Sequence, residues 1–262
     1  MKISVEKIDS FKARNYLESN TANRSVRQTH VEYLADQMKR GLFVSNGETI
    51  KIADDGRLLD CQHRLLAIVQ ANFCADFVVV RNLPNSVFST IDTGKPRTTA
   101  DCLNVMGEAN YTKLAAAGTS LACWLKNNQF YSSVRMPSDD VFSALNQYPN
   151  VRDYVKYFSG GKSNANKLGG ISSMAAVCAV FEKKYGSDLI HQFMQQFIDG
   201  ENLSRGMPAY ALRERFAGIS RTNKIYTDVR VAMFAKALLY HCLNKPMKIC
   251  KINPDESLKF YV

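Results

Sequence analysis

The pattern of apolar residues changes near residue 98, and this change constrains the fold more than any other feature of the sequence. Before that point, short runs typical of strands come between segments in which apolar residues recur at helical spacing. After it, the pattern is helical with few strand signals. The chain has 262 residues, enough for one large or two modest domains. We therefore predict an α+β protein, with an α/β domain over residues 1–105 and an all-α helical domain over residues 106–262.

The N-terminal domain is expected to begin with a short strand over residues 3–8, followed by a connector that runs to residue 22. Apolar residues in the segment 29–40, THVEYLADQMKR, recur at helical spacing, which predicts a helix. Gly41 follows directly, at the place where glycine commonly ends a helix.

Strand and helix then alternate. A strand is predicted over residues 49–53, and the tight-turn sequence Asp-Asp-Gly at 54–56 joins it to a return strand over 57–59. The segment 62–71, QHRLLAIVQA, has an apolar face and is predicted to be helical. The segment 76–81, DFVVVR, is typical of a buried strand.

The C-terminal domain is predicted to consist of helices, with Ser138 as the N-cap of one of them. His191 and His241 lie among apolar neighbours, so we interpret both as satisfied interior or boundary histidines rather than ligands. The last residues, 246–262, are expected to form a partly extended tail lying on the body of the domain. The predicted helices span residues 112–127, a segment from 138 onward, 171–185, 188–198, 208–218 and 228–243.

Seven cysteines are present, and their number and spacing indicate free thiols. The number is odd and no pair has the C-x-x-C spacing, as expected in a reducing cytoplasm. No ligands cluster as a zinc site requires, so no metal site is predicted. The opening MKISVEKIDSF lacks the apolar core of a secretion signal, and no segment approaches the ~20 apolar residues of a membrane span. We expect a cytoplasmic protein with no membrane contact.

The net charge of +10 favours a polyanionic partner, above all nucleic acid, although a positive surface also serves solubility. Residues 1–100 carry 14 Lys and Arg against 11 Asp and Glu, a net charge of +3. The remaining residues carry 20 against 13, a net charge of +7. The candidate DNA-binding residues are Arg213, Arg215 and Arg221.

The segment 58–67, LLDCQHRLLA, joins the end of a predicted strand to the start of a helix. Asp60 is the candidate N-cap of that helix. The first N–H groups of a helix have no partner within it, and the helix dipole adds about half a positive charge there. An anion fits that place, where Arg64 supplies a full charge and His63 a donor that titrates near neutral pH. This junction is therefore the predicted phosphate site.

A second candidate segment spans residues 92–98, with the sequence DTGKPRT. Asp-Thr-Gly indicates a turn, the lysine and Arg97 supply positive charge, and Thr98 or Thr99 can cap the next helix. The segment is either a second phosphate contact or a capped surface turn with solvated charges. Two interpretations are likewise open for Arg24 and Arg27: they either clamp a phosphate or lie in a solvated loop.

Residues 60–64, DCQHR, are similar to the D-G-Q-H-R motif of one branch of the ParB/sulfiredoxin superfamily, which includes many small phage and prophage proteins. Asn23 and Arg24, the helix after them and Gly41 resemble the N-P-R, helix, glycine opening of ParB-type domains. Residues 91–98 resemble a D-T-G-x-x-R-T segment of the phage branch. The resemblance covers residues 3–105 and implies a ParB/sulfiredoxin-like fold for that domain.

The resemblance implies that the junction holds the phosphate of a nucleotide, ATP or CTP with Mg²⁺, or of DNA. Backbone N–H groups and the Arg64 guanidinium would hold the phosphate, and Arg24 and Arg97 would clamp it. Asp60 would cap the helix or act as a base, and Glu48 would hold a divalent ion if a triphosphate binds. The expected phosphate ligands are Asn23, Arg24, Cys61, Gln62, His63, Arg64, Thr93, Arg97 and Thr98. The expected catalytic residues are Asp60, His63 and Glu48.

Cys61 departs from the motif, which has glycine at this place. Glycine allows a positive φ and a close approach of backbone to phosphate, and a cysteine Cβ restricts both. Cys61 also suggests a reactive thiol, because a helix N-terminus lowers a thiol pKa. The sulfiredoxin cysteine directly precedes His-Arg, however, and Gln62 holds that place here, which disfavours this second interpretation.

The sequence thus favours a phage-type ParB-like protein that binds nucleotide or DNA phosphate and acts on or along DNA. If it is an enzyme, a nucleoside triphosphatase or phosphotransferase is expected. Two alternatives stay open: a non-enzymatic phage factor that binds a host protein, and a small-molecule phosphotransferase.

Overall fold

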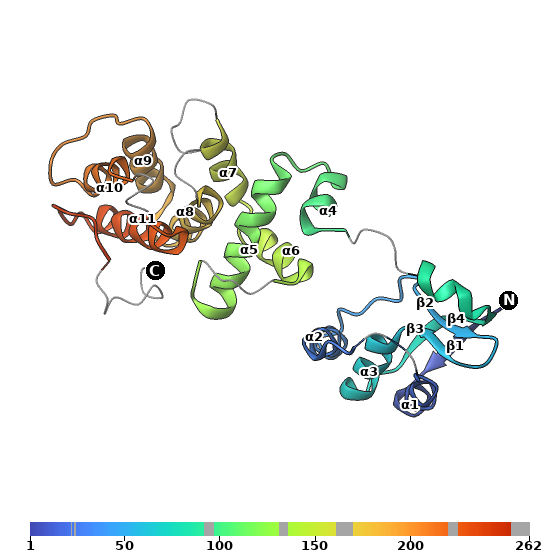
Figure 1. The fold of residues 1–262 in the computed structure, drawn as a ribbon. Coiled ribbons are helices and arrows are strands. Elements are labelled where there is room, and N and C mark those ends of the chain that lie inside the picture. The colour runs from blue at the N-terminus through green and yellow to red at the C-terminus, as the bar shows by residue number, and fades with distance from the viewer. Residues whose placement is uncertain are drawn as a thin grey trace. The chain divides into compact units, whose positions relative to one another are not determined.

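The computed structural model describes residues 1–21, 23, 25–91, 97–130, 136–160, 170–219 and 225–252, and it shows an α+β protein as predicted (Figure 1). The chain divides into two compact units, Met1–Lys95 and Pro96–Val262. The sequence pattern placed this division at residue 105 rather than 95. Within the described residues, the first unit contains a four-stranded sheet and the described elements of the second are helices.

The sheet of the first unit is mixed, with strand order β1-β4-β2-β3. Strand β4 (Ala75–Leu83) pairs antiparallel with β1 (Lys2–Ile8) and parallel with β2 (Thr49–Ala53). Strand β3 (Leu58–Asp60) pairs antiparallel with β2 at one edge of the sheet. The tight turn predicted between β2 and β3 is present, with Gly56 at a φ of +87°.

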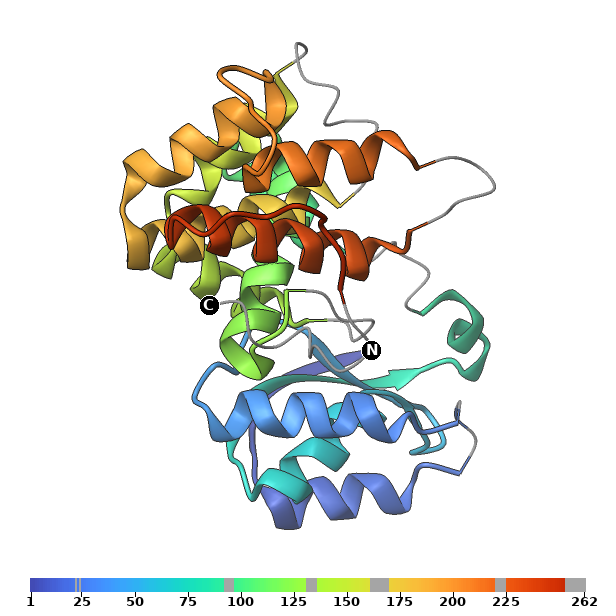
Figure 2. The same cartoon turned by 90° about the vertical axis from the view of Figure 1, so that its left-hand side faces the viewer.

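Three helices cover one face of this sheet: α1 (Ser10–Glu18), α2 (Gln28–Lys39) and α3 (Gln62–Ala71) (Figure 2). Helix α3 packs against both α1 and α2. Ile50 and Ile52 on β2 are buried together with Leu65 and Ile68 on α3, because alternate strand residues point to the helical side. After β4 the chain forms a short 3₁₀ helix, η1 (Asn85–Thr90).

Helix α1 corrects the sequence interpretation, which took these residues as a connector. Asp9 is its N-cap and accepts a hydrogen bond from the backbone N–H of Lys12 at 2.8 Å. The helix has only nine residues, too few to be stable alone, so packing on α3 decides its existence. The helix predicted over 29–40 is confirmed as α2, and Gly41 ends it with a φ of +69°.

A polar network attaches α1 to the sheet. Glu6 on β1 lies 2.6 Å from Lys12 Nζ and accepts hydrogen bonds from Tyr16 and Arg81. The Arg81 guanidinium holds the pKa of Glu6 well below its usual value, while burial raises the pKa of Tyr16 to about 12. The network keeps Glu6 ionised and fixes the first helix against β1 and β4.

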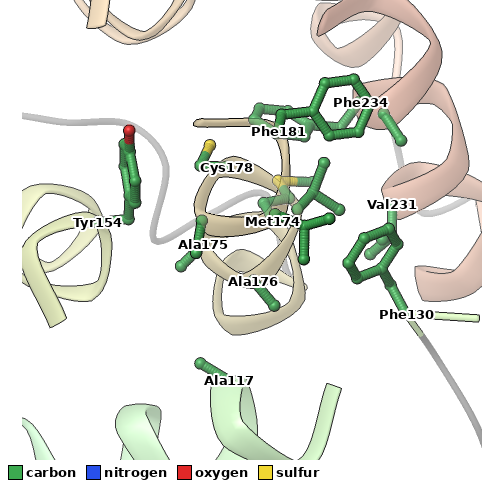
Figure 3. Close-up of a cluster of buried hydrophobic side chains, with 14 of the residues drawn as sticks. Ala117, Phe130, Tyr154, Met174, Ala175, Ala176, Cys178, Phe181, Val231 and Phe234 are labelled. Carbon is green, nitrogen blue, oxygen red and sulfur yellow. The ribbon is translucent and has the colours of Figure 1, made fainter. Parts of the chain in front are cut away.

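The second unit packs its helices around α8, in which residues 173–181 are buried without interruption. A helix that is apolar on all sides belongs in the middle of a bundle. Figure 3 shows side chains of α5, α7 and α11 gathered around α8, with Tyr154 and Phe234 on different sides of it. The described helices of this unit are α4 (Thr99–Val105), α5 (Tyr111–Asn127), α6 (Ser138–Gln147), α7 (Val151–Ser159), α8 (Ile171–Tyr185), α9 (Ser187–Ile198), α10 (Pro208–Ala217) and α11 (Thr227–Cys242).

Ser138 is not the N-cap of α6, contrary to the sequence prediction. The N-cap is Pro137, whose extended backbone places Ser138 as the first helical residue. The Ser138 hydroxyl lies 2.8 Å from that of Thr99, so it links α6 to α4 instead of capping its own helix.

The described part of the tail, residues 246–252, lies on the helical unit as predicted. Met247 and Cys250 are buried, and the Met247 N–H donates to the carbonyl of Gly206 at 2.8 Å. Lys236, buried on α11, donates to the carbonyl of Lys251 at 3.0 Å. All seven cysteines are free, and among the described residues no helix is long and apolar enough to cross a membrane.

His241 on α11 is not fully satisfied, which corrects the sequence interpretation. Within the described part of the chain its Nε2 is buried and has no hydrogen-bond partner. Burial lowers the pKa of His241 from its ordinary value of 6.5, against a smaller opposing effect of a hydrogen bond with the backbone of Leu189. The folded unit therefore favours the neutral ring.

We expect the helical unit to lose stability as the pH falls below about 6.5, because the unfolded chain then takes up a proton that folded His241 resists. The stability is present above the unfolded pKa and is lost as the pH falls through the lower, folded pKa. Urea unfolding followed by circular dichroism at pH 7.5 and 5.5 measures the loss, which should be smaller in His241→Gln. His191→Gln, on the exposed side of α9, is the control. An unchanged pH dependence in His241→Gln would contradict the assignment.

Candidate phosphate-binding site

Cys61 stands between β3 and α3 in a left-handed conformation, with φ 93° and ψ 9°. This is the place where the similar motif has glycine, and here a residue with a Cβ adopts the backbone that glycine favours. A left-handed residue other than glycine costs roughly 1–2 kcal/mol. The turn lets the chain leave the edge strand and enter α3 directly, since the Cys61 carbonyl accepts the first helical bond from Leu65 at 3.0 Å.

The surroundings of the Cys61 thiol disfavour a reactive thiolate. Cys61 is only 4% exposed, and burial raises the pKa of its thiol to about 12. The nearby Arg64 charge acts in the opposite direction but is outweighed. The alternative of a thiol activated by the helix N-terminus is therefore disfavoured in this conformation, because burial outweighs the nearby positive charges of Arg64 and Lys51.

Asp60 does not cap α3, contrary to the prediction. The N-cap is Cys61, whose own side chain makes no cap hydrogen bond. One oxygen of Asp60 accepts from the Cys61 N–H at 2.6 Å, and the other accepts from Lys51 Nζ at 2.8 Å. The carboxylate of Asp60 is thus held by its neighbours, and the side chain of the N-cap residue does not compensate the dipole of α3.

Arg64 lies in the first turn of α3, with a side chain that is 14% exposed. Its NH1 lies 2.8 Å from Glu48 Oε2, and its NH2 lies 3.7 Å from Asp60 Oδ2 and 3.5 Å from the Thr49 carbonyl. The guanidinium is therefore fixed beside the helix start, where it could pair with an anion bound to the first N–H groups of α3.

Lys51 also belongs to this cluster, although it was not among the residues predicted from the sequence. It lies on β2 between the buried residues Ile50 and Ile52, so it points away from the helical core. The alternation of the strand sequence TIKIA was the signal, but the pairing with Asp60 depends on the register of β2 with β3. The cluster thus has two cations, Lys51 and Arg64, and two carboxylates, Asp60 and Glu48.

His63 is buried and positions the chain before α2. Its Nε2 accepts a hydrogen bond from the backbone N–H of Arg27 at 3.0 Å, and an accepting nitrogen carries no proton. That nitrogen does not donate to a ligand in this arrangement. Two amides make similar connections: Asn20 donates to Gln62 Oε1 at 3.2 Å, and Asn23 donates to the Leu58 carbonyl at 3.3 Å.

The described structure does not place the remaining predicted phosphate ligands relative to this cluster. Arg24 and Thr93 lie outside the described residues, and Arg97 and Thr98 belong to the second unit. Of the two threonines predicted as candidate caps, Thr98 caps α4, in a capping box with Asp101. Glu48 faces Arg64, and the described residues contain no group of three or more His, Cys, Asp or Glu that could hold a metal ion.

The predicted DNA-binding arginines differ from one another in their surroundings. Arg213 on α10 donates to the carbonyls of Phe197 and Ile198, the last residues of α9. These bonds give it a structural role, because they satisfy carbonyls that a helix end leaves without partners. Arg215 is half-buried on the same helix, and Arg221 lies outside the described residues. Contact of these residues with DNA stays a prediction.

Comparison of the chain with protein-family models, with curated proteins and with solved structures finds no match.

The left-handed conformation of Cys61 predicts how substitutions at residue 61 change the stability of the first unit. Cys61→Ala keeps the backbone strain and loses the buried sulfur, whereas Cys61→Gly removes the strain. We expect the Gly variant to be more stable than the Ala variant by about 1 kcal/mol, the reverse of the usual order within helices. Chemical denaturation of the first unit within the full chain measures this. Ala67→Gly in the middle of α3 is the control and should destabilise. A Gly variant at 61 that is less stable than the Ala variant would show an ordinary φ there.

Proposed function

We propose that the first unit is a cytoplasmic phosphate-binding module, which holds the phosphate of a nucleotide or of DNA at the start of α3. The observation that carries the proposal is the left-handed residue Cys61, whose side chain does not cap the helix that follows it. Backbone N–H groups at such a helix start point toward an anion, and the dipole favours negative charge.

The cations of the cluster support the proposal. Arg64 is fixed in the first turn of α3, and a guanidinium matches phosphate oxygens in a bidentate manner. Asp60 does not compete strongly for Arg64, because its oxygen lies 2.8 Å from Lys51 but 3.7 Å from Arg64. Lys51 thus neutralises Asp60, which leaves Glu48, a largely exposed residue, as the carboxylate paired with Arg64.

The nature of the ligand rests on charge and on the resemblance to the phage branch of the ParB/sulfiredoxin superfamily. That resemblance implies ATP or CTP with Mg²⁺, and the net charge of +10 favours a polyanion. We propose that the protein acts on or along DNA. The two alternatives are a factor that binds a host protein, which an absence of DNA binding would favour, and a small-molecule phosphotransferase.

Arg64→Gln is expected to weaken binding of ATP or CTP by about tenfold or more, because it removes a charge-assisted contact to phosphate. Isothermal titration of the full-length chain measures the effect. Arg40→Gln removes the same charge from an exposed pair with Asp36 and should leave the affinity unchanged. Equal weakening in both variants would mean that general charge, and not the site, binds the nucleotide.

If the +7 charge beyond residue 100 binds DNA, the affinity should fall steeply with salt and depend little on base sequence. Each neutralised phosphate contributes about −0.9 to the slope of log K against log salt. Arg215→Gln with Arg221→Gln should then flatten the slope by up to about 1.8. Arg213 is left intact, because it holds the end of α9.

Gel-shift titrations across a series of salt concentrations measure this slope. A wild-type protein that binds no DNA even at low ionic strength would contradict DNA binding and favour the host-protein alternative.

A further inference from the structure

The ion pair between Arg64 and Glu48 is asymmetric. The Arg64 side chain is 14% exposed, while that of Glu48 is 60% exposed, although their atoms NH1 and Oε2 lie 2.8 Å apart. The arginine is therefore fixed by its surroundings, and the glutamate reaches it from the solvent side. Of the two carboxylates near Arg64, Glu48 is the closer one.

A turn in the backbone before β2 positions Glu48 beside Arg64. Asn46 Oδ1 accepts a hydrogen bond from the Glu48 N–H at 3.1 Å, and Gly47 adopts a φ of +81°. This turn fixes the Cα of Glu48 next to the first residue of β2, while its side chain stays largely in solvent. The carboxylate can thus turn away from Arg64 without any change in the strand.

The contact with Glu48 does not satisfy Arg64 completely. NH1 is buried and, despite the short distance, lies outside hydrogen-bonding geometry with Glu48. A pair with one largely exposed partner contributes little to stability, because solvent screens it. A phosphate has oxygens enough to meet the guanidinium in a bidentate manner, so it can replace the carboxylate with a better-formed contact.

We propose that Glu48 is an internal competitor for the phosphate on Arg64 and thereby determines the specificity of the site. In the unliganded protein its carboxylate occupies the place that the ligand takes. A ligand must carry enough negative charge to displace a carboxylate, so the site selects multiply charged phosphates over singly charged anions. This inference rests on the proposed phosphate site and assigns Glu48 a role different from that of a metal ligand.

The test is an isothermal titration of the full-length chain with inorganic pyrophosphate in the absence of divalent metal. Glu48→Gln keeps the size of the side chain and removes its charge. It should bind pyrophosphate about fivefold more tightly than the wild type, the size of effect expected when a competing exposed pair is removed. Glu32→Gln, on the exposed side of α2, removes the same charge and should have no effect.

A double variant separates competition at Arg64 from a general change in charge. In an Arg64→Gln background the gain from Glu48→Gln should vanish, because there is no longer a guanidinium to compete for. A gain that persists in that background, or one that Glu32→Gln reproduces, would overturn the inference.

The remaining outcomes distinguish this inference from the proposed function. If the wild type binds pyrophosphate and Glu48→Gln binds it equally or more weakly, the competition is refuted and the phosphate site stands. If neither protein binds pyrophosphate, both the inference and the phosphate site are refuted.

Discussion

The left-handed turn at Cys61 is the constraint on which the first unit depends. It brings the chain from an edge strand of the sheet into α3, and α3 is the helix that packs against both of its neighbours. The same turn places Asp60 and Arg64 on either side of the helix start. A residue with a Cβ adopts this backbone because its side chain is buried in the core that the turn creates. Fold and candidate site are thus two consequences of one conformation.

Two ion pairs with different properties meet at this turn. Lys51 and Asp60 lie 2.8 Å apart on paired strands, so sheet register fixes both partners. Arg64 and Glu48 lie equally close, but one of them is largely in solvent. The first pair therefore behaves as part of the structure, whereas the second can exchange its carboxylate for another anion. For this reason, the proposed binding of phosphate at the start of α3 would require little rearrangement.

The helical unit shows how a charge counted in the sequence can have a structural use. Arg213 contributes to the net charge of +7 beyond residue 100, yet its guanidinium donates hydrogen bonds to two carbonyls at the end of α9. Lys236 likewise donates to a carbonyl of the tail that covers α11. The positive charge that remains for a partner is therefore smaller than the sequence suggests.

The sequence by itself determined the elements whose signals are local. The bounds of β2 and α3, the glycine that ends α2 and a threonine cap for α4 follow from periodicity, turn chemistry and capping, which act within a few residues. The position of the candidate site at the strand-to-helix junction was predicted for the same reason. Tertiary structure alone decided that residues 10–18 form α1, that Lys51 holds Asp60 and that Glu48 reaches Arg64. Each of these depends on packing or on strand register between residues distant in the chain, and no local pattern specifies where a side chain finds its partner.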